Sequence, residues 1–353
     1  MRRRSARVGA VPAAVVVALL AAAAPAAASA SGLLGPAPRR PDGRFANFAD
    51  PLDRGGPAVE LPFMVRRVLG FLRAVEGVPE TVADPLGELA HHSEATVTWV
   101  NHASVLVRHD GVRYLTDPAW SRRAGPAGFF GARRLVDPAF PLAQLPPVDF
   151  VLVSHNHYDH LDLPALVEIA RLQPRARFLV PLGNAELLRG EGIANVSEHD
   201  WGERLRIGDV DVHCLPSQHW SRRGPFDENA ALWSSWAVVG RARRVYFSGD
   251  TGMSTPMFEA IGRAFGPFDL AALPIGAYEP AAMMRAVHLD PEEAVAAARL
   301  LDARRILGIH WGSFDLTDEP IGEPPVRFRA AVADAGLAAE QGWVFAIGET
   351  REF

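Results

Sequence analysis

The chain has 353 residues, of which 48% are hydrophobic and 22% are charged, and its formal net charge is −5. This length suits one large or two medium domains, and the apolar fraction is enough for a packed core, which excludes a wholly disordered chain. The acidic balance argues against a protein that binds nucleic acid non-specifically, because such a protein needs a basic face. Cys214 is the only cysteine, so no internal disulfide can form.

The first thirty residues have the organisation of a secretory signal peptide. Four arginines precede an apolar run from Val11 to Ala28, and Ala28-Ser29-Ala30 fits a small-residue cleavage site. We therefore expect cleavage after Ala30 and an exported protein, whether periplasmic, at the cell surface or secreted. An uncleaved membrane anchor is the alternative, because the run approaches the length of a spanning helix. Pro12 and Pro25 favour the signal peptide.

Residues 31–92 are expected to form an N-terminal extension, rich in Pro, Gly and Arg at its start. It includes helical apolar spacing over Leu61 to Val75. Residues 93–353 are expected to form the main domain, whose first strands are predicted at Thr96–Val100, Ser104–Val107 and Val112–Leu115, with a hairpin turn at Asp110-Gly111. A loop rich in Pro, Gly and Arg is predicted from Asp117 to about Pro147.

A buried strand over Val148–Val153 is predicted to lead into a histidine-rich loop and then into a helix, Leu163–Leu172, capped by Asp162. The second half repeats this order. Its strands are predicted at Arg204–Ile207, Val210–Leu215, Leu232–Val239, Arg244–Ser248, Leu270–Ile275 and Ile306–Ile309, and a helix at Pro291–Leu301 begins with a capping box of Asp290 and Glu293. We therefore expect an α/β (α+β) fold in which two sheets pack together with helices outside.

Four candidate metal ligands lie in the loop between the buried strand and its helix: His155, His157, Asp159 and His160. Imidazole nitrogen and carboxylate oxygen are ligands of borderline and hard divalent cations. Alternate residues of an extended loop point the same way, so His155 and His157 can reach one ion. Asp159 and His160, past the bend, can face a second ion. The plain alternative, a surface turn, is disfavoured because strand-end loops are where open sheets carry their sites.

Two ions need further ligands, and His219, Asp250 and His310 each follow a predicted strand. Gly249 and Gly312 beside them allow close approach of the backbone. Any one of these three residues alone would more readily be a surface or core residue. Together with the loop at 155–160 they supply the ligand count of a hydrolytic site. The ligand types suit zinc, although manganese or iron would also fit.

In type, order and spacing these residues resemble the metallo-β-lactamase superfamily. The resemblance implies an αββα sandwich, with two mixed β-sheets flanked by helices. It also implies two zinc ions per chain, the first held by His155, His157 and His219 and the second by Asp159, His160 and His310. Asp250 resembles the bridging carboxylate.

The flanking sequences resemble the N-acyl-phosphatidylethanolamine-hydrolysing phospholipase D family over about residues 95 to 330. The matching segments include 101–104, 115–118, 248–252, 274–280, 288–294 and 310–312. The implied activity is hydrolysis of a phosphodiester by a metal-bridging hydroxide, which would convert N-acyl-phosphatidylethanolamine-like lipids to phosphatidic acid and N-acylethanolamine. Asp159, Asp250 and His288 would be the catalytic residues. Small residues and two Met at Ala281–Ala286 replace bulkier aromatics of that family and leave the acyl preference open.

Several other residues have two interpretations. His288 and Tyr278 are candidate substrate-binding residues, but His288 would also stabilise its own turn and Tyr278 would also pack. His102 is either a partner of a metal ligand or a core residue. Arg222 and Arg223 are interpreted as solvated surface charges rather than phosphate ligands. Trp120, Phe129 and Phe130 are interpreted as a cover for the core rather than an acyl groove.

Other functions remain as alternatives. A lactonase on the same scaffold is the nearest, and a β-lactamase is less favoured, although export suits one. A nuclease is disfavoured by the acidic mature chain, whose net charge is about −9 after four arginines leave with the signal (−5 minus 4). A non-catalytic exported zinc- or lipid-binding protein would be expected to have lost ligands. We expect a phospholipid or small-molecule substrate, with peripheral membrane contact, and no nucleic acid; the oligomeric state is open.

Overall fold

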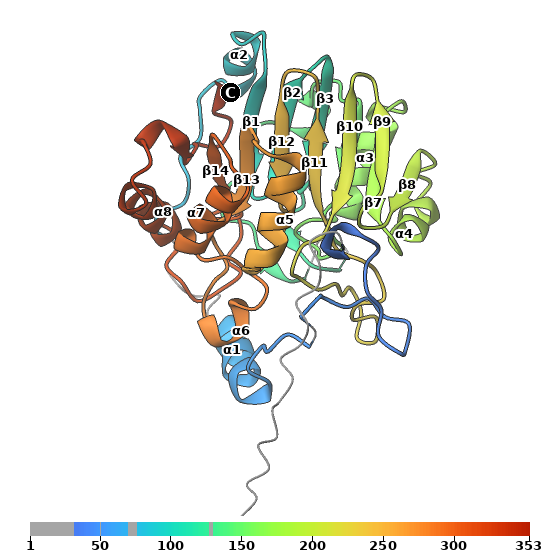
Figure 1. Ribbon diagram of the computed structural model, residues 1–353, viewed down its shortest axis with the longest axis vertical. Helices are drawn as coiled ribbons and strands as arrows, with labels where there is room; N and C mark the ends of the chain where they lie inside the picture. Colours follow the sequence, from blue (N-terminus) through green and yellow to red (C-terminus); the bar gives the residue numbers. More distant parts are fainter. Residues whose placement is uncertain (1–31, 50, 70–75, 127–129) are drawn as a thin grey trace, which may run out of the picture.

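The computed structural model describes residues 32–49, 51–69, 76–126 and 130–353. Within these residues, two seven-stranded sheets form a sandwich that has helices on its outer faces (Figure 1). The predicted signal peptide at residues 1–30 lies outside the described residues. In the described part of the chain, no helix is long and apolar enough to cross a membrane.

The first sheet has the strand order β16-β1-β2-β3-β6-β7-β8. Its strands are β1 (Thr96–Asn101), β2 (Ser104–His109), β3 (Val112–Thr116), β6 (Phe150–Leu152), β7 (Arg177–Pro181), β8 (Val196–His199) and β16 (Thr350–Glu352). Strands β1 to β3 are antiparallel neighbours, and β6, β7 and β8 continue the sheet in parallel. The parallel strands are connected by helices α3 (Leu163–Leu172) and α4 (Ala185–Gly190).

The second sheet repeats this plan in the order β15-β14-β13-β12-β11-β10-β9. Its strands are β9 (Arg204–Ile207), β10 (Val210–Leu215), β11 (Ser235–Val239), β12 (Arg244–Phe247), β13 (Leu270–Pro274), β14 (Ile306–Ile309) and β15 (Gly342–Trp343). Strands β9 to β12 are antiparallel and β12 to β15 are parallel, with α5 (Thr255–Phe265), α7 (Pro291–Leu300) and α8 (Glu323–Asp334) as the connections. The predicted αββα sandwich of two mixed sheets is confirmed.

The remaining α-helices and strands lie outside the two seven-stranded sheets. They are α1 (Pro57–Leu69), α2 (Pro85–Ala90), the strand pair β4 (Arg123–Ala124) and β5 (Ala132–Arg133), and α6 (Ala281–Met284). The helix predicted over 61–75 thus begins earlier, at Pro57, and residues 70–75 lie outside the described residues. The region predicted as a loop from Asp117 contains the β4–β5 pair. The strand predicted from Leu232 begins only at Ser235.

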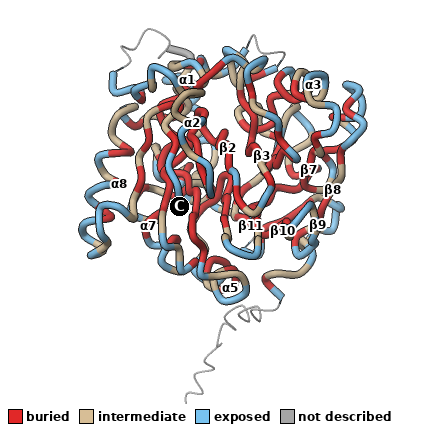
Figure 2. Tube along the Cα trace, turned by 90° about the horizontal axis from the view of Figure 1, so that it is seen from above, coloured by how far each residue is buried: buried red, intermediate tan, exposed pale blue. Residues whose placement is uncertain are grey.

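The hydrophobic core lies between the sheets, and the chain is buried through the strands and exposed along the outer helices (Figure 2). Tyr114 on β3 and Phe150 on β6 stack with their ring centroids 4.8 Å apart. Trp236 on β11 donates its indole N–H to the carbonyl of Val153, just past β6, at 3.0 Å. Buried indoles need such a partner, and this one joins the two sheets where the histidine-rich loop begins.

Asp162 fixes the other end of that loop. Its carboxylate accepts hydrogen bonds from Ala165 N, which caps α3 as predicted, and from the backbone N–H groups of Trp120 and Ser121 at 2.8 and 2.6 Å. It also accepts the Ser121 hydroxyl at 2.7 Å. One buried side chain therefore joins the start of α3 to the long loop that follows β3.

We expect Asp162→Ala to lower the free energy of unfolding by on the order of 2–4 kcal/mol. The backbone N–H groups of Trp120 and Ser121 would lose a charged acceptor, and α3 would lose its N-cap. Asp290→Ala is the matched control, since Asp290 caps α7 in a capping box with Glu293 but holds no second loop. Its expected loss is about 1 kcal/mol. Urea denaturation measures both, and equal losses would contradict the role of Asp162 as a loop anchor.

Candidate metal centre

Seven candidate ligands converge at one end of the sandwich. The loop of residues 155–160 follows β6, and His219, Asp250 and His310 follow β10, β12 and β14. Parallel strands end at the same edge of a sheet, which places their following loops together. Gly249 has φ +56°, and a Cβ at this position would lie 2.3 Å from the Cβ of Ser154, so only glycine fits beside Asp250.

The first cluster consists of His155, His157 and His219. Nδ1 of His157 lies 2.8 Å from Nε2 of His155 and 3.2 Å from Nε2 of His219. Nitrogens around a tetrahedral zinc ion, with bonds of about 2.0–2.1 Å, are separated by about 3.3 Å. Burial lowers the pKa of His157 to about 3 and the pKa values of the other two well below their usual range. All three imidazoles are therefore neutral, the form that binds metal.

The second cluster consists of Asp159, His160 and His310. The Nε2 atoms of the two histidines face each other at 3.1 Å, and each lies 3.5 Å from Oδ2 of Asp159. His102, which is buried, places its Nε2 3.1 Å from the same carboxylate oxygen. Burial lowers the pKa of His102 to about 3, so its neutral ring can donate an N–H to Asp159. The structure thus favours the partner role for His102.

Asp250 lies between the two clusters. Its Oδ2 is 3.1 Å from Nε2 of His160 and 3.2 Å from Nε2 of His310, in the second cluster. The same oxygen is 3.8 Å from Nε2 of His219 and 4.0 Å from Nε2 of His155, in the first. Its Oδ1 is buried and has no hydrogen-bond partner. This position suits a carboxylate shared by two ions.

The charge balance of the second cluster also fits a cation. Burial opposes the charged form of His310, but the carboxylates of Asp250 and Asp159 outweigh it and raise its pKa to about 9. His160 behaves alike: against the effect of burial, the same carboxylates raise its pKa well above the usual value. Buried carboxylates require compensating positive charge. Protons on His160 and His310 supply it here, and a metal ion would replace them.

Neighbouring polar groups orient the ligands. Oδ2 of Asp117 lies 2.6 Å from Nδ1 of His160, and the same carboxylate accepts both the N–H and the hydroxyl of Ser154. Nδ1 of His219 lies 2.9 Å from the carbonyl of Val287. Such contacts fix the ring and the tautomer of a metal-binding histidine. Asp117 was not predicted to have a role, and its signal in the sequence is an Asp-Pro pair directly after a strand.

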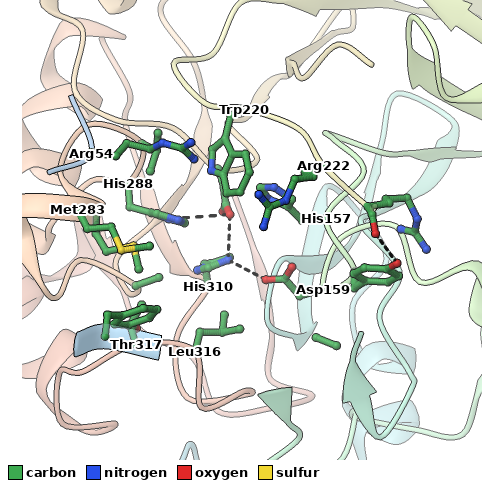
Figure 3. Close-up of a pocket in the computed structure, with 18 of the residues that line it drawn as sticks. Arg54, His157, Asp159, Trp220, Arg222, Met283, His288, His310, Leu316 and Thr317 are labelled. Carbon is green, nitrogen blue, oxygen red and sulfur yellow. Dashed lines mark hydrogen bonds and ion pairs between the residues drawn. The ribbon is translucent and has the colours of Figure 1, made fainter. Parts of the chain in front are cut away.

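A pocket of about 530 Å³ opens over the two clusters. Figure 3 shows Arg54, Trp220 and Arg222 on one side and Met283 and Leu316 on the other, with Asp159, His288 and His310 between them. The pocket therefore has a cationic wall and an apolar wall that meet at the candidate metal ligands.

His288 lies at the ligand end of the pocket. Its Nδ1 is 3.9 Å from Oδ2 of Asp250 and has no hydrogen-bond partner. Tyr278 is not among the lining residues: its hydroxyl donates to Oε1 of Glu323 at 2.9 Å, and Arg327 lies over its ring. Because this hydroxyl is already paired away from the pocket, the candidate role of Tyr278 in binding substrate is not supported, and its packing interpretation is favoured.

The prediction that Arg223 is a solvated surface charge is wrong. It is part-buried, its guanidinium lies over the ring of Tyr158, and it donates to the carbonyls of Asn156 and Leu161 at 2.8 and 2.9 Å. It therefore braces the histidine-rich loop. Arg222, whose side chain is 50% exposed, is solvated as predicted, but it also lines the pocket.

The three loop aromatics differ from one another. Trp120 packs against the core and donates its indole N–H to Phe140 O, as expected for a core cover. Phe130 is 71% exposed, so the prediction that it covers the core is wrong. Phe129 lies outside the described residues.

We expect metal binding to release protons. The raised pKa values of His310, about 9, and of His160, well above its usual value, leave both rings protonated at pH 7 in the metal-free protein. A bound ion therefore displaces about two protons. Affinity for metal should therefore increase as the pH is raised from 7 towards 9. Calorimetric titration at pH 7, in buffers of different ionisation enthalpy, counts the released protons. His310→Ala should reduce the count by about one. A heat that does not depend on the buffer would contradict the assignment.

Comparison with known proteins agrees with this geometry. A model of the beta-lactamase superfamily domain matches residues 112–311. The chain is 45% identical over 245 residues to N-acyl-phosphatidylethanolamine-hydrolyzing phospholipase D 1 of Caenorhabditis elegans, covering 66% of this chain and 69% of that protein. It is 41% identical over 308 residues to an uncharacterized protein of Mycobacterium tuberculosis, covering 84% and 80%.

Solved structures show the same fold at low identity. A metallo hydrolase from Ignicoccus hospitalis is 23% identical, with a TM-score of 0.53 over 73% of this chain and 99% of the other. An isothiocyanate hydrolase from Delia radicum gut bacteria is 19% identical, with a TM-score of 0.57 over 73% of this chain and 98% of the other. The chain therefore belongs to the beta-lactamase superfamily, as a metal-dependent hydrolase of the metallo-β-lactamase fold.

Proposed function

We propose that this protein is a phosphodiesterase of phospholipase D type that cleaves N-acyl-phosphatidylethanolamine-like lipids to phosphatidic acid and N-acylethanolamine. The observation that carries the proposal is the two-sided pocket over the candidate metal ligands. An anionic phosphodiester with an acyl chain needs a cationic surface and an apolar surface beside the reacting centre. The proposal is also supported by similarity to N-acyl-phosphatidylethanolamine-hydrolyzing phospholipases D of Caenorhabditis elegans, at 45% identity, and of Saccharomyces cerevisiae, at 32% identity.

The cationic wall would attract and orient the phosphodiester. Arg54 lies with its guanidinium 4.2 Å from the Trp220 ring centroid, and Arg222 lies 5.4 Å from the same centroid. Both guanidiniums approach one carboxylate, that of Glu228, at 3.4 and 3.9 Å. Two positive charges thus share one negative charge at the rim of the pocket, which leaves a net attraction for an anionic substrate.

The ligand end of the pocket would act on the phosphoryl group. Two metal ions, when bound, would supply an activated water and neutralise charge at phosphorus. Burial, stronger than the influence of the Asp250 carboxylate, lowers the pKa of His288 to about 4. The neutral imidazole can donate a hydrogen bond from its N–H to a phosphoryl oxygen. The Asp159 carboxylate, whose pKa is held well below the usual range by neighbouring histidines despite burial, stays ionised and can orient a water molecule.

The apolar wall would hold an acyl chain. Phe63 from α1 is 6% exposed and lines the pocket together with Met283 and Met284 from α6. Methionine side chains are flexible and polarisable, and they adapt to apolar groups of different shape. We therefore expect the protein to accept acyl chains of more than one length.

We also propose that the protein is exported, since residues 1–30 have the composition of a cleaved signal peptide. N-terminal sequencing of protein recovered from the producing cells should then begin at Ser31. A chain that still begins at Met1 and is recovered with the membrane would favour an uncleaved membrane anchor instead.

The decisive assay is product analysis by mass spectrometry. Mature protein of known metal content is incubated with N-acyl-phosphatidylethanolamine in mixed micelles. Phosphatidic acid and N-acylethanolamine are expected from the unaltered protein. Asp250→Asn should retain less than about 1% of that turnover, because it alters the ligand shared by both clusters. A chelator should abolish turnover, and added Zn²⁺ should restore it.

Parallel reactions with a lactone and with nitrocefin test the other hydrolases of this fold. Lactone turnover without phosphatidic acid, by protein with about two metals per chain, would replace the phospholipase assignment with a lactonase. Lipid binding without turnover of any substrate would favour the non-catalytic alternative.

A further inference from the structure

The N-terminal arm, defined here as residues 37–47, is docked on the loop of residues 219–229. Arg44 donates to the carbonyls of Phe226 and Glu228 at 3.0 and 2.8 Å, and the N–H of Phe45 donates to Asn229 O at 2.9 Å. The Phe45 side chain is 2% exposed and belongs to the main core. The arm is therefore held by side-chain and backbone contacts to the loop that carries His219 and Trp220.

Asn47 makes the most specific of these contacts. It is buried, its Oδ1 accepts the N–H of His219 at 3.1 Å, and its Nδ2 donates to the carbonyl of His219 at 2.8 Å. One amide thus satisfies both backbone polar groups of a single residue, as a paired strand would. Only one orientation of the amide makes both bonds. Together with the Nδ1 contact to Val287 O, this holds His219 at three points.

The position of His219 decides whether the first cluster is complete. The other two members, His155 and His157, come from one loop, and His219 is the member contributed by the second half of the chain. Its Nε2 must remain near the 3.2 Å separation from His157 Nδ1 for three nitrogens to face one ion. The loop 219–229 contains no helix or strand that would hold it there.

We propose that Asn47 is a positioning residue for the first metal site, and that the N-terminal arm is part of the metal centre. The proposal rests on the metal centre described above, but not on the identity of the substrate. Coupling between two sites is reciprocal. Metal at the first cluster should therefore stabilise the docked arm, as the arm stabilises metal binding.

Metal titration of the full mature protein tests this directly. Co²⁺ absorption and Zn²⁺ competition with a chelator give the affinity of each site, and His219→Ala identifies the signal of the first site. Asn47→Ala should weaken the first site by about 10–100-fold, the usual effect of removing a group that orients a ligand. The second site should change much less. Asn195→Ala is a control for the loss of an amide-to-backbone hydrogen bond at an exposed position, because its amide donates to Ala176 O at 2.9 Å, away from the ligands.

Asn47→Asp covers the case in which the alanine variant does not fold. Its carboxylate keeps the acceptor for the His219 N–H but cannot donate to the His219 carbonyl, so the first site should again be weakened. Unchanged affinity at the first site in either folded variant, even with a lowered melting temperature, would overturn the proposal and leave Asn47 a purely structural residue.

Hydrogen exchange supplies the reciprocal measurement. In the unaltered protein, exchange at Phe45 and Ala46, whose N–H groups donate to Asn229 O and Pro38 O, should slow when Zn²⁺ is added. In Asn47→Ala the slowing should be lost. Exchange in the unaltered protein that does not respond to metal would overturn the coupling. Neither measurement depends on phospholipase turnover, so failure of this inference and failure of the proposed function are distinguishable.

Discussion

The structure depends on two carboxylates, Asp159 and Asp250, that are enclosed by imidazole rings. An ionised carboxylate removed from water is costly unless positive charge and hydrogen bonds compensate it. Here His102 faces Asp159, and His160 and His310 face both carboxylates at 3.1 to 3.5 Å. The surrounding loops have to hold these rings in place, and much of the buried polar network near the strand ends serves that requirement.

The two sheets make this concentration of charge achievable. In each half of the chain, antiparallel strands lead into parallel strand–helix units, so the loops that leave the parallel strands gather at one end of the sandwich. The buried hydrogen bond from Trp236 to Val153 fixes the beginning of the histidine-rich loop, and the hydrogen bonds to Asp162 fix its end. Charged ligands are thus attached to well-packed elements, which keeps their geometry from relaxing.

Local patterns in the sequence predicted the framework well. The strand hairpins, the Asp162 and Asp290 caps and the cluster at 155–160 are all readable within a few residues. Strands β7, β8, β15 and β16 were not predicted. The edge strands β15 and β16 have only two and three residues, which carry little periodicity.

The supporting residues of the site could not be predicted in this way. Asp117, Arg223 and Asn47 act on partners 43, 67 and 172 positions away, and no spacing rule links such pairs. Tyr278 lies in a segment that resembles a phospholipase D family, but its hydroxyl is directed towards Glu323. No local pattern in the sequence links these two residues.

The division of the ligands between the two halves of the chain has a consequence for the stability of the folded protein. Four candidate ligands come from the first half of the chain and three from the second. Two metal ions bound at the centre would therefore cross-link the two halves, which are otherwise joined by packing and hydrogen bonds. With Cys214 as the only cysteine, the chain has no disulfide to do this. Its stability should then follow free metal concentration by mass action, gaining roughly 1.4 kcal/mol for each tenfold rise above the dissociation constant. Bound metal would thus act as a cross-link between the two halves, and the stability that it adds would depend on the concentration of free metal around the protein.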